Sequence, residues 1–101
     1  MYTLVLYDIR DDSVRDKARR LLLKHGFTPL NKSAYVGASG RGEREYLARR
    51  LSQLAGEGDI IVLLQVSSEQ LRRAIFIVRG EVWNSISERG VIVVGGPREE
   101  S

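Results

Sequence analysis

Residues 2–9 alternate between the two faces of an extended chain, and both faces are apolar as far as Asp8. The segment is rich in aromatic and β-branched side chains and is shorter than most helices, so it predicts a strand. Leu6 points to one face of this strand and Tyr7 to the other. Because a strand that is apolar on both faces is covered on both sides, we expect it to lie inside a sheet with other groups packed against each face.

Two segments carry apolar side chains at helical spacing. Residues 12–25 place Ala18 and Leu22 on one stripe, and residues 43–55 place Leu47 on another. The remaining sides of both segments are mostly charged. The pattern therefore predicts two amphipathic helices, each with one face packed on a core.

The extended segments that follow each helix differ in character. Residues 27–37 predict either one long strand or a bent pair of strands, and the glycine-containing residues 38–42 predict a loop. Residues 59–66 have the most apolar strand pattern in the chain, and residues 67–73 favour a short helical turn after it. The order of the elements is therefore strand, helix, extended segment, helix and strand.

The C-terminal part predicts two further strands, at residues 74–78 and 91–94, with the polar segment 81–90 between them. This separation is longer than a tight hairpin connection of about two to five residues. The aliphatic side chains of residues 91–94 need an existing sheet edge, so we expect this strand to pair with a partner subunit's sheet rather than to fold back onto its own. We expect a single domain over residues 1–96 and a flexible tail over residues 97–101.

This order of elements is typical of an α/β domain of the α+β sandwich kind, with two helices packed on one face of a sheet. Two helices leave the other sheet face without a cover. The strands at residues 2–9 and 59–66 are nevertheless apolar on both faces. A symmetry-related copy of the chain is the simplest cover, so we expect a homodimer that forms through its sheets.

The composition excludes several classes of protein. The chain has no cysteine, which excludes a disulfide framework and a thiolate metal site, and its single His25 excludes the usual histidine-rich zinc site. No apolar run approaches the roughly 20 residues of a membrane span. The sequence starts directly in a strand pattern without a signal-peptide pattern, so we expect a cytoplasmic protein with no membrane partner.

The positive charge is modest, but arginine supplies most of it. The formal net charge is +3, and of the 16 cationic residues only Lys17, Lys24 and Lys32 are lysine. Arginine suits phosphate because its planar fork donates two parallel hydrogen bonds. A GC-rich genome or a hot habitat also explains this usage. Charge alone therefore favours a GC-rich genome or a hot habitat over nucleic-acid binding as the reason for the arginine content.

Several short motifs occur together in one order along the chain. They are Tyr7-Asp8-Ile9 with Asp11-Asp12 after it, a helix that contains Arg15 and ends in Lys24-His25-Gly26, the set Ser33, Tyr35 and Gly37, and the pair Gly58-Asp59 before an apolar strand. No one of these motifs is specific, but the ordered set resembles the CRISPR-associated Cas2 family. The resemblance covers nearly the whole chain.

The resemblance implies a ferredoxin-like fold with an antiparallel sheet, and a homodimer whose two sheets face each other. It also implies a small subunit of CRISPR adaptation that bridges two dimers of the CRISPR integrase. Some members of the family are metal-dependent endonucleases on RNA or double-stranded DNA, and others act only as scaffolds. The chain departs from the family pattern at Pro29, where a basic residue is frequent, and at Asn31, where glutamine or arginine is frequent; these departures put nuclease activity in more doubt than the fold.

Asp8 is the main candidate for chemistry, as a catalytic and metal-binding residue. It lies at the end of an apolar strand, where sheets of α/β domains tend to place functional groups. One carboxylate is a poor site for Mg²⁺, which takes six oxygen ligands, but the second Asp8 of a homodimer would complete a site for Mg²⁺ or Mn²⁺ with water and a phosphate oxygen. The residues alone leave open whether Asp8 is merely a turn residue before the helix, and the resemblance favours a function. Asp11 and Asp12 are expected to cap the helix.

A second group of residues is expected to bind nucleic acid through phosphate. Cationic side chains near the first helix form a strip, and a hydroxyl in the next extended segment adds a donor. These residues are Arg10, Arg15, Arg19, Lys32 and Ser33. The alternatives are a solvated helix face with an Asp16–Arg20 pair, and a strand serine that hydrogen-bonds the backbone.

Three classes of function remain after these observations. The first is the nucleic-acid-associated adaptation subunit, as nuclease or as scaffold. The second is a non-catalytic RNA-binding domain of the same fold, but residues 60–66 lack the aromatic side chains that such domains use. The third is a small-molecule sensor domain, against which the arginine-rich first helix argues.

Overall fold

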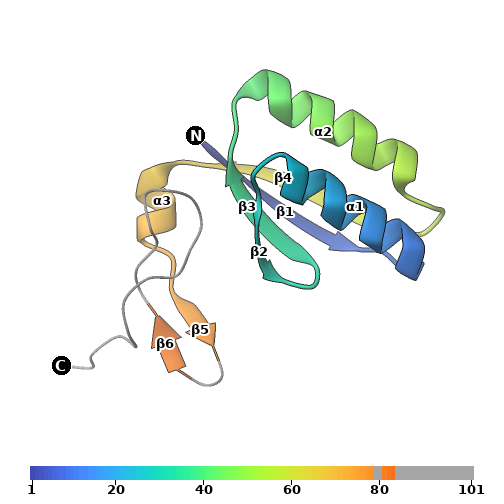
Figure 1. Ribbon diagram of the computed structural model, residues 1–101. Coiled ribbons are helices and arrows are strands. Elements are labelled where there is room, and N and C mark those ends of the chain that lie inside the picture. The colour runs from blue at the N-terminus through green and yellow to red at the C-terminus, as the bar shows by residue number, and fades with distance from the viewer. Residues whose placement is uncertain (79–80, 84–101) are drawn as a thin grey trace.

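A computed structural model describes residues 1–78 and 81–83 of the chain (Figure 1). Its elements, in chain order, are β1 (Tyr2–Asp8), α1 (Asp12–Lys24), β2 (Thr28–Asn31), β3 (Ala34–Ala38), α2 (Arg41–Leu54), β4 (Ile60–Val66), α3 (Ser68–Arg72), β5 (Phe76–Val78) and β6 (Glu81–Trp83). The first six of these elements form the sandwich, and α3 leads into a separate hairpin of β5 and β6.

The main sheet is antiparallel and has the strand order β2-β3-β1-β4. β1 lies between β3 and β4, so Val5 stands opposite Tyr35 on one side and Leu63 on the other. Both long helices, α1 and α2, cover the same face of this sheet (Figure 1). The predicted α+β sandwich of ferredoxin-like type, with two helices on one face of an antiparallel sheet, is confirmed.

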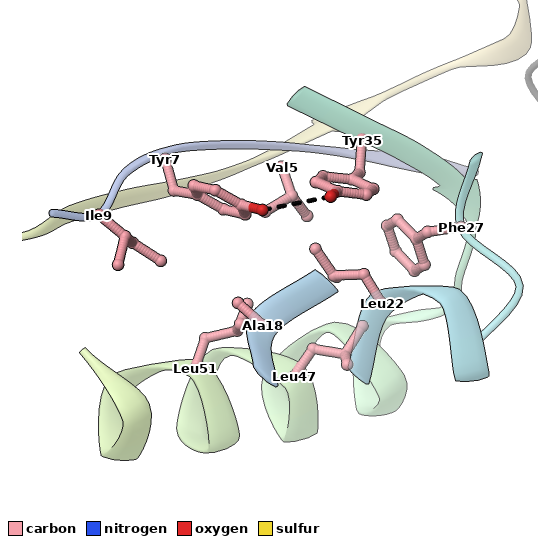
Figure 2. Close-up of a cluster of buried hydrophobic side chains, with 9 residues drawn as sticks. All are labelled: Val5, Tyr7, Ile9, Ala18, Leu22, Phe27, Tyr35, Leu47 and Leu51. Carbon is pink, nitrogen blue, oxygen red and sulfur yellow. Dashed lines mark hydrogen bonds between the residues drawn. The ribbon is translucent and has the colours of Figure 1, made fainter. Parts of the chain in front are cut away.

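The core lies between the sheet and the two helices. Side chains from alternate positions of β1 meet the inward stripes of α1 and α2, because alternation along a strand and helical spacing both place apolar groups on one side. The buried cluster consists of Val5, Tyr7, Ile9, Ala18, Leu22, Phe27, Tyr35, Leu47 and Leu51 (Figure 2). Ala18, Leu22 and Leu47, which helical spacing places on the apolar stripes, are therefore buried.

The other face of the sheet carries apolar side chains that remain exposed. On β4, Ile60 is 61% exposed, Val62 45% and Leu64 50%, and Leu6 of β1 is 39% exposed. β1 and β4 are neighbours, so these side chains form one continuous patch, which we call the open sheet face. A contiguous apolar patch of this kind marks an interaction surface.

Residues 27–37 form a pair of strands, the second of the two predicted alternatives. β2 and β3 are antiparallel and are joined by a turn at residues 32–33. Close packing requires a glycine at position 37 in β3, because a Cβ there would lie 2.8 Å from two ring atoms of the buried Phe27. The predicted loop at residues 38–42 is too long, since α2 already begins at Arg41. Gly40 is the N-cap of that helix and supplies no side-chain hydrogen bond.

The prediction for the C-terminal region is wrong at residues 81–83. β6 pairs with β5 in antiparallel register, Phe76 opposite Trp83, so only residues 79–80 separate the two strands. Valine and tryptophan favour strands, but a strand this short gives too weak a pattern to distinguish it from a polar connection. β6 thus takes three residues from the connection 81–90 that separates the two strands in the strand-exchange prediction. The predicted strand 91–94 and tail 97–101 lie outside the described residues.

Asp11 is the N-cap of α1. Its carboxylate accepts hydrogen bonds from the amide and the hydroxyl of Ser13, at 2.9 and 2.7 Å, and from the amide of Val14 at 3.0 Å. These bonds satisfy amide groups that the first helical turn leaves without partners. The hydroxyl of Ser13 first, and then the amide of Val14, hold the pKa of Asp11 below its usual 3.8.

A pH-dependent contribution to stability follows from this cap. Because the pKa of Asp11 is lower in the folded chain, the unfolded chain binds more protons, and the stabilisation is present above the unfolded pKa and is lost as pH falls through the folded value. Asp11→Asn keeps a capping side chain but does not titrate. Thermal melts between about pH 5 and about pH 2 are expected to show a smaller loss of Tm for Asp11→Asn than for the wild type. Equal losses would contradict the role of this carboxylate.

Within the described ranges 1–78 and 81–83, the structure has no helix that is both long and apolar enough to span a membrane.

Candidate functional site

Asp8 is exposed at the C-terminal end of β1, on the open sheet face. It stands opposite Ile60 of β4, and the same alternation that buries Tyr7 turns Asp8 away from the helices. Two hollows meet at this residue. One, of about 260 Å³, extends over the open sheet face to Leu6 and Val62, and the other, of about 430 Å³, extends towards the side of α1. Asp8 therefore lies at the border between the apolar patch of the open sheet face and the polar hollow beside α1.

Three predicted residues share the polar hollow with Asp8. Arg15, Lys32 and Ser33 all line the cavity of about 430 Å³. Arg15 is fixed by its own contacts, because its Nη1 donates to the carbonyl of Ile9 at 3.0 Å and its Nη2 pairs with Asp12. The guanidinium is thus held beside the end of β1 while part of it stays accessible to solvent.

Ser33 lies in the turn between β2 and β3, and the expectation of a strand serine is wrong. Asn31 holds this turn, since its Oδ1 accepts from the amide of Ser33 at 2.8 Å and from its hydroxyl at 3.3 Å. The carbonyl of Ser33 accepts from the amide of Tyr7 at 2.9 Å, which ties the turn to β1 next to Asp8. Asparagine often orders the backbone two residues further on, so the sequence carried a signal for this role that the prediction missed.

A second cationic hollow lies alongside the first. It has about 220 Å³ and brings Arg19 together with Arg15 and Lys32. Asp16 also lines it, at 3.6 Å from the guanidinium of Arg19. The predicted Asp16–Arg20 pair is present at 2.8 Å, and both pairs are exposed, so neither holds its arginine strongly. Arg19 can therefore turn towards an anion in this hollow, beside the fixed guanidinium of Arg15.

Arg10 is separated from the other predicted cations. Its guanidinium lies beside Gly58, whose φ of +85° suits glycine and where an added Cβ would come within 3.8 Å of the guanidinium carbon. The amide of Arg10 donates to Asp59 Oδ1 at 3.2 Å, and the amide of Gly56 donates to Asp59 Oδ2 at 2.8 Å. Asp59 thus connects the segment after Asp8 to the turn before β4, a role that the sequence analysis did not assign.

Two tyrosines form the inner wall of the cationic hollow. The Tyr7 hydroxyl donates to the Tyr35 hydroxyl at 3.2 Å, and both rings belong to the buried core (Figure 2). Burial first, and then the hydrogen bond to Tyr35, raise the pKa of Tyr7 well above its usual value of 10.0. Tyr7 therefore stays neutral and is a packing residue rather than a general base. Tyr35, at 1% exposed, is a packing residue as well.

The described part of the chain contains no cluster of three or more histidine, aspartate or glutamate side chains that could hold a metal ion. Among the described residues, Asp8 is the one carboxylate that lines the two hollows meeting at the end of β1. One protomer thus offers a carboxylate and the Ser33 hydroxyl. That set alone is a poor site for Mg²⁺, which takes six oxygen ligands, so a site would also need the carboxylate of a second protomer, waters and phosphate oxygens.

The fold and this site define an α+β domain with a cationic hollow beside a strand-end carboxylate and an open apolar sheet face. The family model of CRISPR associated protein Cas2 matches residues 1–74, which include all of these features and end before the β5–β6 hairpin. The chain belongs to the Cas2 family of CRISPR-associated proteins.

Individual relatives agree with this assignment. The chain is 32% identical over 89 residues to the CRISPR-associated endoribonuclease Cas2 of Thermofilum pendens, covering 88% of this chain and 95% of that protein. A Thermoproteus tenax protein, named a CRISPR-associated endonuclease Cas1/endonuclease Cas2 fusion, is 31% identical over 78 residues, which are 76% of this chain and 30% of the fusion. The crystal structure of Streptococcus pyogenes Cas2 matches with a TM-score of 0.64 at 20% identity, over 73% of this chain and 95% of that one, which is a likeness of fold.

Proposed function

We propose that this chain is a CRISPR adaptation subunit that acts on nucleic acid as a homodimer in the cytoplasm, with metal-dependent endonuclease activity on RNA or double-stranded DNA. The observation that supports this most is the place of Asp8 on the open sheet face, beside the cationic hollow. Replacing Asp8, with and without Mg²⁺ or Mn²⁺, tests the proposal.

The homodimer is supported by the open sheet face. Its side chains are aliphatic and about half exposed, and burying them in an interface removes apolar area from water. A two-fold axis through this face would bring the same patch of both subunits together, which is how an isologous interface forms. Asp8 lies on this face opposite Ile60, so in such a dimer both Asp8 carboxylates would lie at the interface.

The metal chemistry follows from the two carboxylates. The two Asp8 side chains of a dimer, each in a hollow that Ser33 also lines, would hold Mg²⁺ or Mn²⁺. When bound, such an ion activates water and neutralises the charge that develops on phosphate. Asp8 and Ser33 thereby select where a phosphodiester is attacked.

The cations hold the substrate. Arg15 and Lys32 lie in the same hollow as Asp8, and Arg19 extends the positive surface along α1. An arginine side chain donates two parallel hydrogen bonds to phosphate oxygens. The two arginines, with Lys32, would therefore orient the backbone of RNA or DNA beside Asp8. We propose that these side chains contact the phosphates of the substrate and not the edges of its bases.

A scaffold role alongside the integrase has separate support. The Thermoproteus tenax relative joins Cas1 and Cas2 in one chain, and such a fusion places the two parts in permanent proximity. We propose that this chain has an integrase subunit as its partner and bridges two of its dimers. In this role the dimer and the cationic surface are required, and cleavage at Asp8 is not.

Nucleic-acid binding is expected to depend on salt through α1. Replacing Arg15 and Arg19 together by alanine should weaken binding of a duplex oligonucleotide and flatten the plot of log affinity against log salt concentration, by about one unit for each phosphate that the variant no longer neutralises. Fluorescence anisotropy across a series of salt concentrations measures both effects. The double variant Arg41→Ala with Arg73→Ala removes the same charge outside the two hollows and is the control. An unchanged slope for the α1 variant would place the binding surface elsewhere.

A further inference from the structure

A groove between α1 and α2 is not used by the proposed function. It has about 300 Å³ and is lined by Lys17, Arg20, Leu21, Lys24, Arg50 and Leu54, which we call the helix groove. Four of these six side chains are cationic and two are leucine. No acidic side chain of the described residues lines the helix groove, whereas Asp8, Asp12 and Asp16 line the hollows between β1 and α1.

The cations of the helix groove are poorly neutralised by the protein itself. Arg20 pairs with Asp16 at 2.8 Å, and the pair is exposed. Arg50 donates to the neutral hydroxyl of Tyr46 at 3.3 Å. In the part of the chain that the structure describes, neither Lys17 nor Lys24 is in an ion pair with a carboxylate. Four like charges around one groove attract an anionic ligand.

The two leucines of the helix groove indicate which kind of anionic ligand fits it, a phosphate backbone or an acidic protein segment. Leu21 and Leu54 are only partly buried, so the bottom of the groove is apolar and reachable. A phosphate backbone pairs with the cations but offers nothing apolar to cover leucine, whereas a protein segment can present carboxylates and an aliphatic side chain together. Interfaces of this kind have an apolar centre and a charged edge.

We propose that the helix groove is a docking site for an acidic, leucine-bearing segment of a protein partner. Lys17 and Lys24 are seven residues apart on α1, a separation of about 10 Å along the axis. That length matches roughly two turns of a bound helix, with one aliphatic side chain over Leu21 and Leu54 and carboxylates on both sides. The groove lies in the helix layer, so it stays open when the opposite sheet face is paired, and the proposal does not depend on Asp8 (Figure 1).

The test uses a fluorescein-labelled amphipathic peptide with leucines on one helical face and glutamates beside them. Lys17→Glu with Lys24→Glu is expected to weaken its binding to the full chain by at least about tenfold. Arg41→Glu with Arg73→Glu makes the same charge change at exposed positions outside the groove and is expected to leave the affinity within about twofold. Circular dichroism of each variant establishes that the comparison is made between folded chains.

The apolar part is tested with a second peptide in which alanine replaces every leucine at unchanged charge. The leucine peptide is expected to bind more tightly than the alanine peptide, and Leu54→Ala is expected to reduce this difference. Equal binding of the two peptides, or equal losses of affinity in the groove and control variants, would overturn the proposal. It would also be overturned if the peptides fail to bind and duplex DNA loses affinity in Lys17→Glu with Lys24→Glu, because the groove would then belong to nucleic acid.

Discussion

Asp8→Asn is expected to reduce metal-dependent cleavage of RNA or double-stranded DNA by at least about a hundredfold. The amide keeps the size of the carboxylate and removes its charge, and Asp8 is the one acidic side chain among the described residues that line the two hollows meeting at the end of β1. Because Asp8 is exposed, the substitution leaves the core intact. The measurement is the rate of cleavage of labelled single-stranded RNA and of duplex DNA by the purified protein, with Mg²⁺ or Mn²⁺ and with a chelator.

Glu57→Gln is the matched control. Glu57 is an exposed acidic residue before β4, and the same loss of charge there is expected to leave the rate unchanged. Equal cleavage by the wild type and Asp8→Asn would assign the activity to another site or to a contaminant. A wild-type protein that cleaves neither substrate but binds both would contradict the nuclease proposal and favour the scaffold.

Leu64→Arg is expected to convert the homodimer to a monomer. Leu64 is half exposed on the open sheet face, and in a sheet-to-sheet dimer its arginine would be buried without an acidic partner. An uncompensated buried charge costs about 3–5 kcal/mol, which raises the dimer dissociation constant roughly a hundredfold to a few thousandfold. Light scattering and sedimentation at several concentrations measure the mass.

Leu23→Arg serves as the control for this change. Leu23 is 39% exposed on α1, on the helix side of the sheet, so the same substitution should leave the dimer intact. A dimer that survives Leu64→Arg and dissociates with Leu23→Arg would place the interface on the helices. A wild-type protein that is monomeric at all concentrations would contradict the homodimer itself.

The sandwich was predictable because its signals are periodic and local. The apolar run of β1 and the stripes of α1 and α2 each extend over several residue pairs or turns, and the stripes also select the helix side chains that are buried. The short strand β6 has three residues and no repeat, so propensity alone could not separate it from a connection. Its partner β5 was predicted, but the pairing depends on tertiary contacts that a one-dimensional pattern does not contain.

The candidate site was predictable in its residue types and only partly in its geometry. Lys32 and Ser33 join Asp8 because the turn between β2 and β3 is tied to β1 by a backbone hydrogen bond, and Arg15 joins it because its guanidinium donates to the carbonyl of Ile9. Such a tertiary contact cannot be read from spacing. Arg10 is close to Asp8 in sequence, but the carboxylate of Asp59 holds its backbone and its guanidinium lies beside Gly58.

The most direct test of a shared carboxylate site is the number of metal ions that the dimer binds. Mn²⁺ titration followed by electron paramagnetic resonance is expected to give about one ion per two chains in the wild type, because two Asp8 side chains hold one ion. Asp8→Asn and the monomeric Leu64→Arg are both expected to lose this ion. A full ion per chain that persists in monomeric Leu64→Arg would contradict a site built from the Asp8 residues of two subunits.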